Sequence, residues 1–314
     1  MSAAATETDA EKKDGAPRGV IRDRGYKPYQ GTHTSEGGRW TLIAGRMLKM
    51  TARQPWVIVA LILSALPALV FAVIMWFSAK MYMAMQGGMA GMEGMIVESP
   101  DRFVYLLIAK PYGTLLLAFL TALFAGGGAV ADDARAGTFQ FYFARPVTRE
   151  QYLVGKLLPP VVLVAIVALV PSVLVAILRI AVTRDTSEAF SELRLPLSAL
   201  ALGSIEALVL GVPIVALSSL SRGRGYVQGA FAALFLLPWI LGAIFVGVTR
   251  SPWPAVLSIP AHLQNLGHFL FALPWEEGER PMPVVVSAIF LAALVAGSIA
   301  LLRKRLASVE VIAS

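Results

Sequence analysis

Long uninterrupted runs of apolar residues divide the chain into six segments that polar stretches separate. Each run is about 20 residues long, the length that an α-helix needs to cross a hydrocarbon core about 30 Å thick. Backbone groups inside lipid must be hydrogen-bonded, and a helix satisfies them internally. The pattern predicts an all-α membrane protein with six transmembrane helices, at about Trp56–Phe77, within Phe103–Ala131, and at about Leu157–Leu178, Leu195–Leu220, Tyr226–Val248 and Val284–Leu302.

The composition agrees with this class. Hydrophobic residues make up 57% of the 314, charged residues only 15%, and the mean hydropathy is +0.68. A soluble domain would carry about 25% charged residues. The chain has no cysteine, which excludes disulfides, thiolate metal sites and thiol nucleophiles.

The distribution of basic residues predicts the orientation of the spans. With the N-terminus inside, the cytoplasmic segments hold 19 Lys and Arg residues and the outer loops hold 7. This surplus is the positive-inside signal, so we expect a multi-pass protein of the inner (cytoplasmic) membrane with both termini in the cytoplasm. The net charge of +7 then indicates contact with membrane lipid, and no nucleic-acid partner is expected.

The segment before the first span has the pattern of a helix lying in the membrane interface. Drawn as a helix, residues 39–54 place Trp40 and Ile43 on one side and Arg46 and Lys49 on another. The expected organisation is therefore a polar cytoplasmic tail at 1–38, an interfacial helix at 39–54, the six-span domain at 55–303 and a cytoplasmic tail at 304–314.

The stretch between the second and third spans is long, charged and aromatic. Glycines at 126–128 should loosen the end of the second span, and Asp132 and Asp133 should then stop it. A short helix is expected over the aromatic run Thr138–Ala144. After it, Thr148 and Gln151 have the spacing of a capping box that would begin the third span.

This stretch resembles the signature of type-2 ABC transporter permeases, the membrane subunits of ABC exporters. Two departures are that Asp133 stands where the family has Glu, and that the run before the proline is aromatic rather than aliphatic. The matching residues are Asp133, Gly137, Thr138, Pro146, Val147, Thr148, Arg149, Gly155 and Lys156.

The resemblance implies that the short cytoplasmic helix is a coupling helix. It would dock on a separate ABC ATPase subunit, with two ATPases and a permease homodimer in each transporter, and with ATP and Mg²⁺ held by the ATPases. This chain lacks a phosphate-binding G-x-x-x-x-G-K-[ST] loop, so no catalytic, cofactor-binding or metal-ligating residue is assigned to it. The expected coupling residues are Asp133, Gly137, Thr138, Phe139, Tyr142, Pro146 and Arg149.

The outer segment Arg250–Met282 combines leucines at helical spacing with prolines that divide it into short pieces. The resemblance implies short re-entrant helices here, before the last span, and the alternative is an amphipathic surface loop. His262 and His268 are six residues apart and do not share a helix face, which argues against a metal site.

Two charges fall inside the predicted spans, Lys110 in the second and Glu206 in the fourth. An isolated charge at mid-membrane costs about 2.5–3.5 kcal/mol, so we expect the two to pair or to share a polar cavity. Alternatively, Lys110 extends to the outer headgroups, and a protonated Glu206 bonds to Ser204 or to a backbone carbonyl.

The outer loop from Met81 to Met95 holds six of the eleven methionines. Thioethers favour Cu(I), so a copper-linked permease is one alternative function, although methionines also suit a flexible interfacial loop. A membrane assembly scaffold that transports nothing is the other alternative. The sequence does not identify the substrate.

Overall fold

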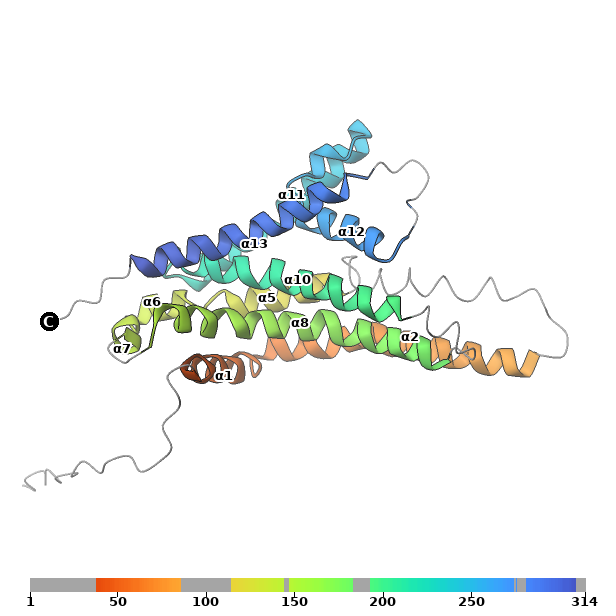
Figure 1. Ribbon diagram of the computed structural model, residues 1–314, viewed down its shortest axis with the longest axis horizontal. Coiled ribbons are helices and arrows are strands. Elements are labelled where there is room, and N and C mark those ends of the chain that lie inside the picture. The colour runs from red at the N-terminus through yellow and green to blue at the C-terminus, as the bar shows by residue number, and fades with distance from the viewer. Residues whose placement is uncertain are drawn as a thin grey trace, which may run out of the picture. The chain divides into compact units, whose positions relative to one another are not determined.

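The computed structural model describes residues 38–85, 114–143, 147–182, 193–273, 275 and 281–308. The chain divides into two units, Met1–Ser35 and Glu36–Ser314, and all described residues belong to the second. Within them every regular element is a helix (Figure 1). The predicted all-α class is therefore confirmed for the part of the chain that can be described.

Five helices are long and apolar enough to cross a membrane, and a sixth is obtained if the bent pair at the N-terminal end counts as one span. The first 11 residues of the predicted second span, which include Lys110, lie outside the described residues. The five lie in α5 (Leu116–Gly126) together with α6 (Ala131–Ala136), and in α8 (Arg149–Val182), α10 (Arg194–Ser218), α11 (Arg224–Thr249) and α13 (Val284–Ala307). The bent pair consists of α1 (Arg39–Thr51) and the first part of α2 (Pro55–Met85).

The helix α1 (Arg39–Thr51) is a separate element, bent by 79° from the first half of α2. It packs against α8, where Gly155 makes the close approach possible. A Cβ on Gly155 would lie 2.9 Å from Ile43 Cβ and 3.2 Å from the Trp40 carbonyl oxygen. The change of direction that an interfacial helix requires is present, and its place on the membrane stays a prediction.

The core forms where α8 runs alongside α10 on one side and α2 on the other (Figure 1). The backbones of α8 and α10 come close at Gly211, where an added Cβ would meet Val161 Cα at 3.0 Å. α5 packs on this pair, and its Phe119 stacks on Phe231 and Phe235 of α11 at centroid distances of 5.5 and 4.4 Å. Small residues and aromatic stacks therefore set the helix spacing.

The glycines, not the aspartates, end α5. α5 stops at Gly126, and Asp132 and Asp133 lie in the first turn of α6. The prediction that the two aspartates stop the second span is therefore wrong. Carboxylates stabilise the positive N-terminal end of a helix, so they begin α6 instead.

The part of the chain after α11 returns to the bundle through two short helices, η3 (Trp253–Ala255) and α12 (Ile259–Leu270). The Ser258 side chain accepts a hydrogen bond from the Ala261 N–H at 3.3 Å and caps the start of α12. α12 packs against α11 and α13, at the end of these helices away from α6 and the short helix α7 (Phe139–Phe143) (Figure 1).

Candidate functional site

The strongest polar cluster in the described residues joins α6 to α8. Lys156 Nζ lies 2.6 Å from Asp133 Oδ2, and the Tyr152 hydroxyl donates to the same oxygen at 2.6 Å. The Lys156 and Asp133 side chains are only 9% and 14% exposed. One carboxylate thus holds two side chains that lie one turn apart on α8.

Aromatic rings from α7 enclose this ion pair. Phe139 and Tyr142 pack edge-on against Tyr152, with centroids 5.8 and 5.2 Å apart. Lys156 Nζ lies 5.7 Å from the centre of the Tyr142 ring and 5.6 Å from that of Tyr152. Burial raises the pKa of the Tyr142 hydroxyl, and the charge of Asp133 adds to the rise while Arg46 opposes it. The cation therefore sits between a carboxylate and two neutral phenol rings.

The turn from α6 to α7 depends on Gly137. Its φ of 67° is left-handed, and its N–H caps α6 by donating to the Asp133 carbonyl. The Thr138 N–H donates to the same carbonyl at 3.0 Å. Nothing lies within 4 Å of a Cβ added at Gly137, so the backbone conformation and not the space favours glycine.

The start of α8 has the capping box that the sequence predicted. The Gln151 N–H donates to Thr148 Oγ1 at 3.2 Å, and the Thr148 N–H donates to Gln151 Oε1 at 3.1 Å. Arg149 is exposed in the first turn. Pro146 lies outside the described residues, so its role stays a prediction.

The side chains of Phe139, Phe141 and Tyr142 on α7 do not face the same way. Phe139 and Tyr142 are half-buried against Tyr152, whereas Phe141 is 73% exposed. Residues three apart share a helix face and a residue between them does not, so this division could have been read from the spacing. Sequence reasoning named the two inward residues as coupling residues. It included Lys156 only as a residue of the family motif and gave no role to Phe141 or Tyr152.

The break between α5 and α6 is held by polar side chains from the last residue of α10 and the first residue of α11. Arg224 donates to the Phe124 carbonyl at 2.7 Å and to Gln54 Oε1 at 3.1 Å. Ser218 Oγ accepts from the N–H groups of Val130 and Ala131, both at 2.9 Å. Backbone groups that the broken helix would leave unpaired are thereby satisfied.

The predicted intramembrane pair cannot be described, because Lys110 lies outside the described residues. Glu206 is 1% exposed on α10, and its Oε1 has no hydrogen-bond partner among the described residues. The methionines at 89, 92 and 95 also lie outside that part of the chain. Both predictions therefore stay untested.

At the other end, His262 joins α12 to α13. Its Nε2 donates to the Val256 carbonyl at 2.8 Å, and its Nδ1 lies 2.9 Å from Ser287 Oγ. The ring stacks on Phe290 with centroids 4.2 Å apart. Both ring nitrogens thus bond to the protein, which is the arrangement of a structural histidine.

Comparison with known families identifies the chain. A family model described as "ABC-2 family transporter protein" matches residues 39–276, about three quarters of the sequence. No curated protein matches the chain. The matched range runs from α1 to the residue after Trp275, and so includes the cluster around Asp133.

Proposed function

The chain belongs to the ABC-2 transporter family. From this we propose that it is an exporter permease whose α6–α7 segment binds a separate ATPase subunit and transmits the conformational change of that subunit to the spans. The observation that carries the proposal is the buried contact of Asp133 with Lys156 and Tyr152. This contact joins α6 to α8, the longest helix described.

The mechanical argument concerns what happens when a partner pushes on α7. A flexible loop would absorb the push. Here the Asp133 ion pair ties α6 to the first two turns of α8, and the packing of Phe139 and Tyr142 on Tyr152 ties α7 to the same turns. α8 in turn contacts α1, α2, α5 and α10. Movement of α7 would therefore be passed to most of the bundle as a shift of packed helices.

The proposed orientation in the membrane rests on the elements that lie at the α7 end of the bundle. The exposed ion pair of Glu150 with Arg303, at 3.2 Å, places the C-terminal end of α13 beside the start of α8. Arg224 brings in the α1–α2 bend through Gln54. We place this end in the cytoplasm, because the basic segments gather there. Both termini are then cytoplasmic, in the inner membrane.

Phe141 offers the sharpest test of docking. Because it is 73% exposed and does not support the cluster, Phe141→Ala should leave the fold intact. An aromatic side chain buried at the centre of an interface contributes enough that its loss weakens binding about tenfold or more. We expect that loss in the affinity of the purified permease for its cognate ABC ATPase, together with loss of coupled ATP hydrolysis.

The control is Phe269→Ala on α12, since Phe269 is 64% exposed at the opposite end of the bundle. It should leave both readouts unchanged. Full ATPase affinity in a well-folded Phe141→Ala protein would contradict docking at this surface. A protein that binds no ABC ATPase at all would instead favour the assembly scaffold.

We further propose that two copies form the transporter. An apolar groove of about 400 Å³ lies between α2 and α8, lined by Leu61, Ala68, Val170 and Leu174 among others. α11 also leaves large apolar side chains exposed, including Leu237, Ile240 and Ile244. Such surfaces suit a second permease or an apolar substrate. Native mass measurement in mild detergent should find two permeases per particle, and a strict monomer would rule the dimer out.

A further inference from the structure

The side of α1 that faces away from α8 carries three exposed cations. Arg46 and Lys49 are three residues apart and share a helix face, and Arg53 follows two residues after the helix ends. Their side chains form no ion pair or hydrogen bond within the part of the chain that the structure describes. α1 holds no acidic residue, and like charges one turn apart repel each other. A bound anion would remove this repulsion.

The apolar side of α1 is already covered by protein. Ala44 is 5% exposed, Ile43 lies against Gly155 of α8, and Met47 packs on the hydrophobic core. In a helix that lies free in the membrane interface, this apolar side would face the acyl chains. Here it faces the bundle, so contact with lipid is left to the side that carries the cations.

Two observations favour a lipid surface as the partner of this side. Leu42 lies one turn before Arg46 and is 61% exposed, and Met50 is 64% exposed. Trp56, at the start of α2, is 63% exposed. Cations, a tryptophan and apolar side chains together at the end of a span are typical of the headgroup level of a bilayer. The second observation is the bend of 79° between α1 and α2, which turns α1 from the direction of the span toward that of the membrane surface.

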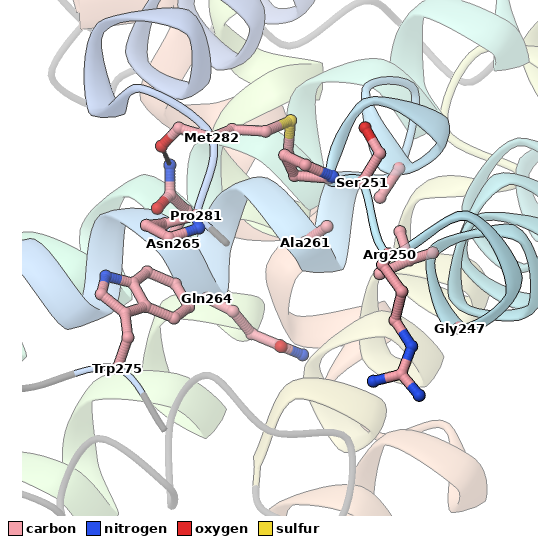
Figure 2. Close-up of a pocket in the computed structure, with 12 residues that line it drawn as sticks. Gly247, Arg250, Ser251, Ala261, Gln264, Asn265, Trp275, Pro281 and Met282 are labelled. Carbon is pink, nitrogen blue, oxygen red and sulfur yellow. Dashed lines mark hydrogen bonds between the residues drawn. The ribbon is translucent and has the colours of Figure 1, made fainter. Parts of the chain in front are cut away.

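The pocket at the opposite end of the bundle has a much lower density of positive charge. Figure 2 shows this pocket, of about 450 Å³, between the end of α11 and α12. Among the described residues that line it, Arg250 is the only charged one. Attraction to an anionic surface grows with each added cation, so the three cations at α1 make the stronger candidate.

We propose that Arg46, Lys49 and Arg53 bind the headgroups of anionic phospholipids, such as phosphatidylglycerol, in the leaflet at the α7 end of the bundle. The lipid phosphates would pair with the guanidinium and ammonium groups. Leu42 would reach the acyl chains between these headgroups.

The bound lipid would hold α1 in place beside the elements that support α7. α1 packs on α8, to which Asp133 also binds. Arg46 lies close to α7, because its charge opposes the rise that burial causes in the pKa of the Tyr142 hydroxyl. The inference goes beyond ATPase docking and does not require it.

The test measures hydrogen exchange over residues 39–51 of the full chain in two kinds of nanodisc. One contains phosphatidylcholine alone, and the other contains equal parts of phosphatidylcholine and phosphatidylglycerol. Each cation at an anionic surface favours binding about fivefold, so we expect the three to slow exchange about 100-fold in the anionic nanodiscs. Salt should weaken the effect, because the screening length falls from about 10 Å at 0.1 M to about 3 Å at 1 M. Equal exchange in the two kinds of nanodisc would overturn the proposal.

The matched variants each replace one arginine and one lysine by glutamine. Arg46→Gln combined with Lys49→Gln should remove about 25-fold of the slowing, at about fivefold for each cation. Lys304→Gln combined with Arg305→Gln changes the net charge equally, at exposed positions in the last turn of α13, and should keep the full slowing over residues 39–51. Equal losses in the two double variants would overturn the assignment to α1.

Two further arms separate the lipid from other anions. Millimolar inorganic phosphate, added to phosphatidylcholine nanodiscs, should leave exchange over residues 39–51 unchanged; full slowing by phosphate would make the free ion the ligand and overturn the lipid assignment. A purified ABC ATPase, added to the same nanodiscs, should also leave this exchange unchanged, and slowing by the ATPase alone would assign the cations to a protein interface. Phe141→Ala should keep the lipid effect, so failure of ATPase docking and failure of this site give different results.

Discussion

The substitution Lys156→Met tests whether the Asp133 cluster fixes α6 and α7 to α8. Lys156 Nζ lies 2.6 Å from Asp133 Oδ2, and the two side chains are 9% and 14% exposed. Methionine keeps most of the buried stem and removes the cation. The Asp133 carboxylate then retains only the Tyr152 hydroxyl as its described side-chain partner.

The magnitude follows from this burial. Removing one partner of a buried ion pair costs about 3–5 kcal/mol, and the partial exposure of Asp133 places the expected loss near about 3 kcal/mol. If α6 and α7 open as a local unit, amide exchange over residues 131–143 should become about 150-fold faster. Adding Asp133→Asn removes the stranded charge and keeps an acceptor for Tyr152, so the double variant should recover about 2 kcal/mol.

Hydrogen exchange followed by mass spectrometry on the purified protein in detergent measures both effects. The control is Arg303→Gln, which breaks the ion pair of Arg303 with Glu150, where the side chains are 60% and 62% exposed. An exposed pair contributes about 0–1 kcal/mol, so exchange there should change little. If Lys156→Met exchanges no faster than Arg303→Gln, or if the losses at 133 and 156 are strictly additive, the reasoning fails.

Two further predictions concern packing and pH. Gly211→Ala places a Cβ 3.0 Å from Val161 Cα and should lower the free energy of unfolding by about 1–3 kcal/mol. At the control position Gly229, an added Cβ meets no atom within 4 Å, so Gly229→Ala should leave the free energy of unfolding unchanged or raise it by up to about 1 kcal/mol. Thermal unfolding in detergent measures both, and equal effects would contradict the close approach of α8 and α10. Burial lowers the pKa of His262 although its bond to the Val256 carbonyl opposes this, so the unfolded chain binds the proton more readily. The free energy of unfolding should therefore fall as the pH drops below about 6.5, the usual pKa of histidine. The variant His262→Gln should flatten this pH dependence between pH 7.5 and 5. An unchanged pH dependence of stability in the variant would exclude His262 as its source.

The sequence by itself determined the features that depend on neighbouring residues. Apolar runs long enough to cross a membrane predicted the helices, because lipid leaves a single chain few other ways to satisfy its backbone. The capping box at Thr148 and Gln151 was predictable because both partners lie within one turn. The motif around Asp133 also indicated the family that the match over residues 39–276 confirms. The local reading failed where two signals competed. The glycines at 126–128 end α5, and Asp132 lies in the first turn of α6 instead of ending the span.

Only the tertiary structure decided which distant side chains meet. Tyr152 and Lys156 reach Asp133 from 19 and 23 residues away, and nothing in the spacing of these residues fixes how α6 lies against α8. The same holds at the other end, where His262 of α12 meets Ser287 of α13 from 25 residues away. Hydrophobic periodicity states that a helix exists and which side is apolar. The depth, rotation and contacts of each helix follow from packing against its neighbours, and that packing turns isolated polar residues into sites.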